Sequence, residues 1–463
     1  LTIQVTNDFA KWEIFYKIIN YCNSVLTYAP GIREIDPNYT EGWLQVHLAE
    51  AYTIRALTYF YLVRIYGDVP FVVRPYADDT ENFNIGFSSE DEILNTLIAD
   101  LKISEQYAVI SRGNATPSDR ILTKGRVTKN AVRALMADIY LWLASGHASN
   151  PALQALEYGE AIAACDRILE WEIDEDKVID KESLTGAELY FVSNKNASNG
   201  SPNLTSVFCL GNSRESIFEL QFDALNHNKK LVEFYGKGVS STEKVRAASY
   251  LNDNAEIFPA NDFRKKDSFQ QTTSKTYRIF KYVGERRSQP NSEATSSYVY
   301  SGSDYPNWIL YRLSDAYLMK AEALVEKPGA TEDELREALR LVNLTYEHSN
   351  PEAELLLWDN YKNNIQDMKD LVLLERQREF LFEGKRWFDL LRLVRREGNS
   401  DRMINLYMIR NHTYSPALPV KLSIRAALYM PIHQNEVMSN AILYETLKKK
   451  QEQGNPFYIY NFE

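Results

Sequence analysis

The most regular pattern of apolar and charged positions lies in residues 371–393, LVLLERQREFLFEGKRWFDLLRL. Its apolar residues recur three and four positions apart, which places them on one side of a helix. Opposite charges recur three apart, so their side chains can meet on the helix surface. These pairs are Glu375 with Arg378, Glu383 with Arg386, and Asp389 with Arg392. Because glycine weakens a helix interior, Gly384 predicts a close approach or a break between two helices.

Five earlier stretches show the same helical spacing. They cover residues 8–28, 41–66, about 90–109, 127–145 and 151–171. Alanines recur three apart from Ala131 to Ala137, and small residues at that spacing let two helices approach closely. Pro30 and Gly31 predict that the first helix ends in a loop over residues 29–40. We interpret this part as consecutive antiparallel helix pairs of the tetratricopeptide kind, although their period is irregular.

The pattern changes after residue 171. Asn, Ser, Gly and Thr become frequent, and only short strand-like pieces remain, at residues 216–222 and 276–282. Helical spacing returns over residues 309–326, 332–347 and 367–393. We therefore predict a mainly α protein in three parts. These are helix pairs over 1–171, a loop-rich insertion with short strands over 172–308, and further helix pairs with a mixed tail over 309–463.

Composition narrows the classes of function. The net charge of −11 argues against a nucleic-acid partner, which favours a basic face. The three cysteines are too few, and odd in number, to indicate a disulfide framework. No apolar run is long enough to span a bilayer. The six histidines show no metal-ligand spacing, and there is no glycine-rich phosphate loop or G-x-S-x-G elbow. We expect no catalytic residues, metal or cofactor, although carboxylates are too many to exclude a glycosidase pair by counting.

Two arginines lie in apolar helical stretches. Arg55 is in TIRALTYFYLVRIYG, and Arg312 opens YRLSDAYLMKAEAL. A buried arginine needs a carboxylate partner, and we expect Asp315, Glu322 or Glu383 to supply it. These contacts are interpreted as clamps between helix pairs.

Aromatic residues in the insertion are the main candidates for ligand binding. Thirty tyrosines and seven tryptophans exceed what cores usually need. A sugar ring packs its C–H face on an aromatic ring, while its hydroxyls pair with Asn, Asp, Gln and Arg. Both kinds of residue occur together in residues 288–308. The candidate ligand-binding residues are Tyr298, Tyr300, Tyr305 and Trp308, followed by Tyr235 and Tyr277.

Five segments carry a family resemblance. ERQREFLFEGKRWFDLLR resembles the signature near the C-terminus of the SusD/RagB family of surface nutrient-binding lipoproteins of Bacteroidetes. The others, in chain order, are LVRIYGDVPF, GRVTKNAVRALMADIYLWLA, WILYRLSDAYLMKAEALV and MPIHQNEVMSN. The segment AILYETLKKKQEQG, which stands before NPFY, departs from the family pattern. The five segments together span most of the chain, and they say nothing of the ligand.

The resemblance implies a SusD-like fold and a function in nutrient uptake. It implies a cell-surface protein of the outer membrane that binds an oligosaccharide and delivers it to a SusC-like TonB-dependent transporter, without catalysis. The lipid-bearing cysteine and leader of the family are absent from this sequence, which suggests that they precede Leu1. Three alternatives remain open: a RagB-like peptide binder, an (α/α)6-type glycoside hydrolase, and a scaffold whose helix pairs hold a partner peptide.

Overall fold

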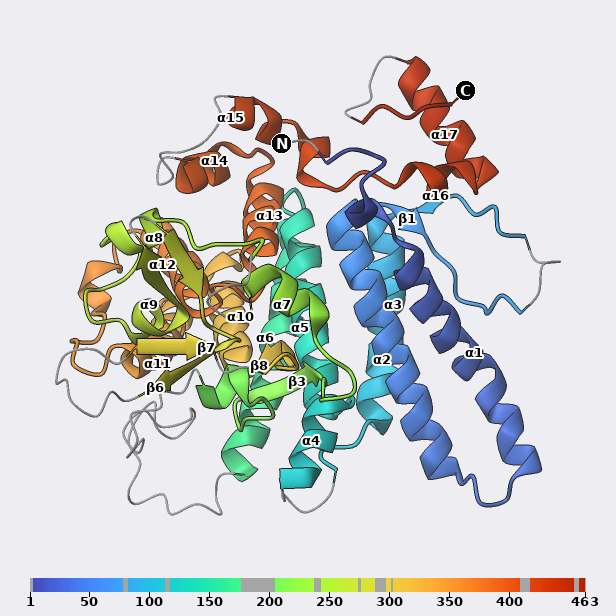
Figure 1. Ribbon diagram of the computed structural model, residues 1–463, viewed down its shortest axis with the longest axis horizontal. Coiled ribbons are helices and arrows are strands. Elements are labelled where there is room, and N and C mark those ends of the chain that lie inside the picture. The colour runs from blue at the N-terminus through green and yellow to red at the C-terminus, as the bar shows by residue number, and fades with distance from the viewer. Residues whose placement is uncertain are drawn as a thin grey trace. The chain divides into compact units, whose positions relative to one another are not determined.

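The computed structural model describes most of the chain, and helices dominate it (Figure 1). The described residues are 3–77, 82–112, 117–175, 205–236, 243–273, 276–287, 297–300, 303–408, 417–453 and 458–462. Their contacts group into two compact units. Unit 1 combines Leu1–Val109 with Leu393–Ile409 and Thr413–Glu463, and unit 2 comprises Ile110–Arg392 with Arg410–His412.

Unit 1 is built on three helices that pack side by side (Figure 1). These are α1 (Glu13–Ile35), α2 (Glu41–Tyr66) and α3 (Glu90–Tyr107). A short antiparallel pair, β1 (Val69–Pro70) and β2 (Phe87–Ser88), lies between α2 and α3 in sequence. The C-terminal helices are α14 (Asp401–Met408), α15 (Ala417–Leu422), α16 (Gln434–Met438) and α17 (Ala441–Glu452). The Met430 amide donates to the Ile65 carbonyl at 2.8 Å, which ties the tail to α2.

Helix α1 is longer than the sequence pattern predicted. It continues through Pro30 and Gly31 to Ile35, where a loop was expected. Proline removes one N–H donor, but packing of the helix on α2 outweighs that loss. An ion pair of 2.6 Å between Arg33 and Glu41 also links the two helices across their short connection.

Unit 2 contains the remaining long helices. These are α4 (Pro117–Gly125), α5 (Lys129–Gly146), α6 (Pro151–Glu175), α10 (Leu313–Glu326), α11 (Glu332–Ser349), α12 (Ile365–Glu379) and α13 (Arg386–Glu397), whose last residues belong to unit 1. Helices α5 and α6 pack as a pair, and α10 packs on α6, α11 and α12. Ala131, Ala134 and Ala137 are fully buried in α5, as their spacing predicted. The fold is mainly α, as expected.

Short strands and helices form the rest of unit 2. The antiparallel strand pairs are β3 (Ser216–Leu220) with β8 (Trp308–Arg312), β4 (Phe269–Thr273) with β5 (Thr276–Ile279), and β6 (Gly284–Arg287) with β7 (Ser297–Tyr300). The helical turns are η5 (Thr205–Cys209), α7 (Lys229–Tyr235), α8 (Tyr250–Asp253) and α9 (Phe263–Ser268). Both predicted strands are therefore confirmed in position.

Strand β8 corrects one boundary. Residues 309–312 were predicted to begin a helix, but they pair with β3, and α10 begins only at Leu313. The Asp315 carboxylate accepts the Arg312 backbone N–H at 2.9 Å and so caps the helix at that point. The expected division into three parts stays a prediction, and its boundary at residue 171 lies within α6.

Candidate functional site

A buried network of charges joins the end of β8 to the loop between α12 and α13. The Arg312 guanidinium contacts Glu379 Oε1 at 2.7 Å and the two carboxylate oxygens of Glu383 at 2.9 and 3.1 Å. Its Nη2 also donates to the Glu379 carbonyl at 2.9 Å. Glu383 is therefore the partner of Arg312, as expected. Asp315, another expected partner, instead accepts the backbone N–H.

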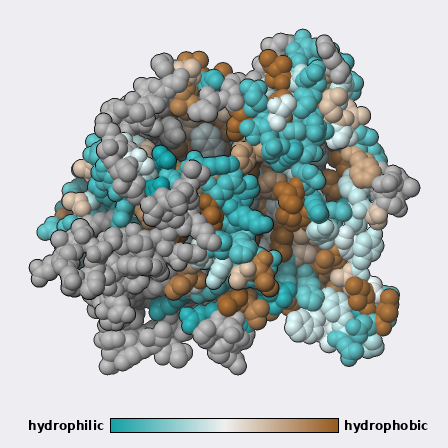
Figure 2. Space-filling model, in the orientation of Figure 1, coloured by the Kyte–Doolittle hydropathy of each residue, from teal (hydrophilic) through white to brown (hydrophobic). Residues whose placement is uncertain are grey.

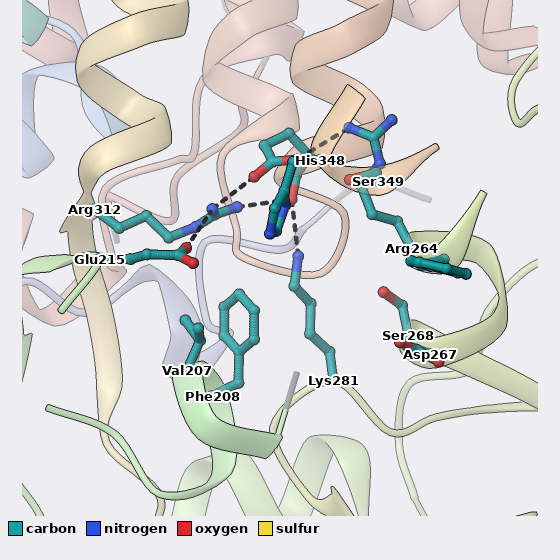
Figure 3. Close-up of a pocket in the computed structure, with 12 residues that line it drawn as sticks. Val207, Phe208, Glu215, Arg264, Asp267, Ser268, Lys281, Arg312, His348 and Ser349 are labelled. Carbon is teal, nitrogen blue, oxygen red and sulfur yellow. Dashed lines mark hydrogen bonds and ion pairs between the residues drawn. The ribbon is translucent and has the colours of Figure 1, made fainter. Parts of the chain in front are cut away.

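Two further cations enter the same network (Figure 3). Lys281, which follows β5, donates to Glu383 Oε1 at 2.7 Å and to the Glu379 carbonyl at 2.9 Å. Arg264 of α9 contacts Glu379 at 3.0 Å and Glu375 at 2.6 Å. The insertion is thus held to α12 by charged hydrogen bonds, which are stronger than neutral ones.

The network holds its carboxylates in the ionised form. Burial raises the pKa of Glu383, but Arg312 and Lys281 outweigh it and lower the pKa to about 2. Burial also raises the pKa of Glu379, and there Arg312 and Arg264 bring it well below the usual range. For Lys281, burial has the larger effect. It lowers the pKa to about 8, although the nearby Glu383 carboxylate acts to raise it. The carboxylates are therefore charged partners of the cations at neutral pH, as a structural clamp requires.

The cavity beside this network is too small for a sugar. It measures about 60 Å³ and is lined by Phe208, Arg264, Lys281, Arg312 and other residues of unit 2. Sites for small organic ligands usually measure about 300–1,000 Å³. The cavity has room for a few water molecules. We therefore assign the network to the architecture of unit 2 rather than to ligand binding.

A second buried group continues along α12 and α13. Arg392 makes two contacts with Glu322, at 2.7 and 2.6 Å, and one with Asp389 at 2.7 Å. Two of the three predicted i, i+3 pairs form, Asp389 with Arg392 and, at 3.4 Å, Glu375 with Arg378. Arg386 of the third pair donates instead to the Leu373 carbonyl. Gly384, at φ +75°, lies in the break between the two helices, as predicted.

The other expected clamp, Arg55, has a different partner from those predicted. It contacts Asp100 of α3 at 2.5 Å and the Asn23 side chain of α1 at 2.8 Å. This single arginine of α2 thus links all three helices of unit 1. Asp100 lies 45 residues after Arg55, so no local spacing connects the carboxylate of α3 with the arginine of α2.

A surface of mixed aromatic and polar side chains lies where β3 and β8 end, and we name it the Tyr305 surface. It is formed by His227, Asp304 and Tyr305, with Asn226 directly before His227 in the chain and Trp308 three residues after Tyr305. His227 Nδ1 and Asp304 Oδ1 are 2.7 Å apart, and the His227 ring stands edge-on to Tyr305 with centroids 6.3 Å apart. Tyr305 is 42% exposed. The surface therefore offers an accessible ring face beside an imidazole and a carboxylate.

Backbone contacts fix this surface. The Asn228 amide donates to the Asp304 carbonyl at 2.9 Å, and the Asn228 side chain donates to the Pro306 carbonyl at 3.0 Å. Trp308 pairs with Leu220 across the strands and stacks on Tyr282 with ring centroids 4.9 Å apart. The two loops that carry the polar side chains are thus held together before any ligand binds.

A cluster of amides supports the same strand ends. Asn307 donates to Glu219 at 2.7 Å and to Gln221 at 3.0 Å, and Gln221 exchanges two hydrogen bonds with Asn212. Gly211, at φ +68°, makes room for this cluster, because a Cβ there would lie 2.7 Å from Asn307 Nδ2. These side chains lock the position of residues 304–308.

The six predicted binding residues are placed differently from one another. Tyr305 lies on the Tyr305 surface, whereas Trp308 is half-buried and packs against a hydrophobic cluster that contains Tyr282. Tyr235 and Tyr277 pack in two hydrophobic clusters, where Tyr235 donates to the Phe382 carbonyl at 2.8 Å and Tyr277 is 6% exposed. Tyr298 and Tyr300 lie on β7, opposite Arg286 and Gly284, and their side chains are outside the described residues. Their roles in binding stay predictions.

Sequence reasoning missed the polar half of this surface. His227 was treated as an ordinary histidine, and Asn226 and Asp304 were not singled out. The run DALNHN at residues 223–228 carried a signal, because Asp and Asn concentrate in tight turns. Asp223 does accept from the backbone of Leu225 and Asn226, but the contacts of His227 and Asn228 with Asp304 depend on the tertiary fold.

Within the described part of the chain, no group of three or more His, Cys, Asp or Glu residues has the arrangement needed to hold a metal ion. None of the helices in that part is both long and apolar enough to cross a membrane.

Comparison with known proteins identifies the family. A family model described as "SusD family" matches residues 215–458, and one described as "Starch-binding associating with outer membrane" matches residues 2–141. The chain is 24% identical to the SusD-like protein P38 of Formosa agariphila over 85% of this chain and 73% of that protein.

Solved structures show the same fold. A SusD superfamily protein of Parabacteroides distasonis is similar with a TM-score of 0.63 and 22% identity, over 95% of this chain and 85% of that one. A protein of Bacteroides vulgatus named as a sugar binding protein has a TM-score of 0.61 and 20% identity, with the same coverage. Because the first family model covers more than half of the sequence, the chain belongs to the SusD family.

Proposed function

We propose that this protein binds an oligosaccharide at the Tyr305 surface and passes it to an outer-membrane transporter. The observation that carries the proposal is the meeting of exposed Tyr305 with His227 and Asp304. A sugar site combines ring faces, which pack against the C–H groups of the sugar, with polar groups, which form hydrogen bonds with its hydroxyls. The sugar-binding name of the Bacteroides vulgatus neighbour agrees with this ligand class.

A peptide is the second candidate ligand, and the geometry favours it less. An extended peptide needs a free strand edge or a row of apolar pockets. The strand ends here are covered by side-chain amides, and the neighbouring groups are polar. A glycosidase requires two carboxyls facing each other across a cleft. Asp304 is the carboxylate of the Tyr305 surface, and it is engaged with His227.

The test of this site is a calorimetric titration with the best ligand from a glycan array. We expect Tyr305→Ala to weaken binding by roughly tenfold, since aromatic anchors dominate such contacts. Tyr21→Ala is the matched control, because Tyr21 is an exposed tyrosine of unit 1 and should leave affinity unchanged. Equal affinity of Tyr305→Ala and the parent, both folded, would place the ligand elsewhere.

Partnership with the transporter is proposed to use α1. Six apolar side chains of this helix are 40–85% exposed, and we name them the α1 stripe: Ile14, Tyr21, Val25, Tyr28, Ile32 and Ile35. The first two are seven residues apart, and the others follow in steps of four and three residues. This is the spacing of a helix face that packs on another surface. Figure 2 shows apolar atoms gathered at the lower end of the column that α1 and α2 form in Figure 1. Such a stripe is unusual on a surface that faces only water.

The occupant that we propose for the α1 stripe is the barrel of a TonB-dependent transporter. The family model over residues 2–141 is described as associating with the outer membrane, and it contains α1. A lasting complex buries roughly 2,000 Å² or more, so the stripe would be one part of a larger contact. The protein would then act at the cell surface.

Purification from the native membrane tests this partnership. A tagged chain should bring down a large β-barrel, and the variant with Tyr21, Tyr28 and Ile32 changed to serine should bring down much less. Tyr305→Ala serves as the control, since it should keep the barrel while losing the glycan. Equal recovery of the barrel with the triple variant would remove α1 from the interface.

A further inference from the structure

A groove in unit 2, which shares no residue with the Tyr305 surface, contains an aromatic ring among charged side chains. It lies between the first two turns of α11 and the short helix η6 (Trp358–Asn360). Its volume is about 520 Å³, within the range of ligand sites. The lining residues are Glu332, Leu335, Arg336, Trp358, Asp359, Lys362 and Asn363.

The wall of the groove that carries Trp358 is held in place by backbone contacts. The Trp358 carbonyl accepts from the amides of Tyr361 and Lys362 at 2.9 and 3.0 Å. The Asn343 side chain of α11 both donates to the Leu356 carbonyl and accepts from the Leu356 amide, at 3.0 and 2.9 Å. The indole is therefore presented by a fixed turn, and little ordering is required on binding.

Arg336 and Trp358 form one continuous side of the groove. The Arg336 guanidinium lies over the indole, 4.5 Å from the ring centroid, and its Nε and Nη2 contact Glu332 Oε1 at 2.8 and 2.6 Å. Within the described residues, Arg336 Nη1 has no hydrogen-bond acceptor. Lys362 Nζ contacts Asp359 Oδ1 at 2.7 Å, and the ammonium group has further N–H donors. The groove thus offers the Arg336 guanidinium lying over the Trp358 indole, spare donors and two exposed carboxylates.

The charge balance selects the class of ligand. Two cations and two carboxylates line the groove, and each cation is already paired, so an anionic ligand gains little and meets repulsion from Glu332 and Asp359. A wholly apolar ligand would leave these groups unpaired. A molecule with a C–H face and many hydroxyls satisfies both the ring and the polar rim.

We propose that this groove is a second binding site for a neutral oligosaccharide, separate from the Tyr305 surface. The proposal shares with the proposed function only the class of ligand, and the two sites have no residue in common. Two carbohydrate contacts on one chain would hold a long glycan at two points. Each weak contact then raises the effective concentration of the ligand at the other.

Fluorine NMR distinguishes the two sites in one experiment. The seven tryptophans are replaced by 5-fluorotryptophan, and Trp358→Phe and Trp308→Phe assign two of the resonances. The probes are linear hexasaccharides of α-1,4-glucose, β-1,4-glucose, β-1,4-xylose and β-1,4-mannose, with a tryptic digest of casein as a peptide probe. We expect the Trp358 resonance to move saturably with at least one hexasaccharide and to stay in place with the peptides.

Matched variants on α11 sharpen the result. Arg336→Ala should raise the dissociation constant at the Trp358 resonance by roughly tenfold. Arg340→Ala should leave it unchanged, because Arg340 lies one turn further on and pairs with Glu337 in the same manner, outside the groove. Asn363→Ala is a second test that removes an exposed side chain from the groove lining. Melting temperatures of all three variants check that they remain folded.

Each outcome bears on one site or both. If no hexasaccharide shifts the Trp358 resonance but one shifts the Trp308 resonance, the second site is refuted and the proposed function is not. The opposite pattern supports the groove and refutes the Tyr305 surface, and no movement of either refutes both. A Trp358 resonance that responds only to the casein peptides overturns the inference in favour of a peptide groove.

Discussion

Arg312 and Arg336 make similar contacts with glutamate, one inside unit 2 and the other on its surface. Arg312 is 3% exposed and lies 2.7 to 3.1 Å from carboxylate oxygens of Glu379 and Glu383. The Arg336 side chain is 50% exposed and lies 2.6 Å from Glu332. Water screens the second pair and not the first, so equal distances carry very different energies. Buried pairs fix the fold here, whereas exposed pairs remain available to a ligand.

The largest expected effect tests the buried side of this comparison. Arg312→Ala should destabilise the protein by about 3–5 kcal/mol, because Glu379 and Glu383 are left buried without their main partner. Urea unfolding followed by circular dichroism measures the change. The matched control is Arg340→Ala, and a similar small loss in both variants would contradict the distinction between buried and exposed pairs.

Acid should act on the same network. Glu383 has a folded pKa of about 2, below its ordinary value of 4.5, so its contribution is present above pH 4.5 and is lost as the pH falls toward 2. The loss should be on the order of 3 kcal/mol. Unfolding by urea across this range should show a steeper decline for the parent than for Glu383→Gln. Parallel curves for the two proteins would show that Glu383 is not linked to stability in this way.

The smallest expected effect concerns the surface pairs. Arg336→Ala and Arg340→Ala should each change the free energy of unfolding by less than about 1 kcal/mol, as exposed ion pairs usually do. The two variants should therefore melt alike and differ only in ligand binding. A loss of several kcal/mol for Arg336→Ala alone would mean that the cation–π contact with Trp358 is structural.

The same contrast explains what could be predicted from the sequence. Helix positions followed from local spacing, and Glu383 was foreseen as a partner of Arg312 because both lie in charged helical motifs. The helix pairs and the strands at residues 216–222 and 276–282 were also readable from local pattern. The start of α10 and the length of α1 were not, since pairing of β8 with β3 and packing of α1 on α2 override local preference.

The candidate site was predictable only in its aromatic half. Tyr305 and Trp308 are candidates because the composition of residues 288–308 is unusual, and the structure exposes Tyr305 beside His227. His227 joins Tyr305 from about 80 residues earlier, and nothing in local spacing connects the two segments. Tyr235 and Tyr277 are aromatic residues of the same insertion, but Tyr235 is partly buried and Tyr277 buried in hydrophobic clusters, because aromatic residues serve cores and surfaces equally well.

Asn343 has a consequence for how the family's surfaces can vary. It holds the turn that carries Trp358 by imitating one rung of a β-ladder, with a donor and an acceptor both directed at the backbone of Leu356. Because only main-chain atoms of the turn take part, the side chains at positions 355–363 can be replaced without losing this attachment. The turn is thus an exchangeable cassette, in which new recognition chemistry can arise by substitution while the helical framework stays as it is.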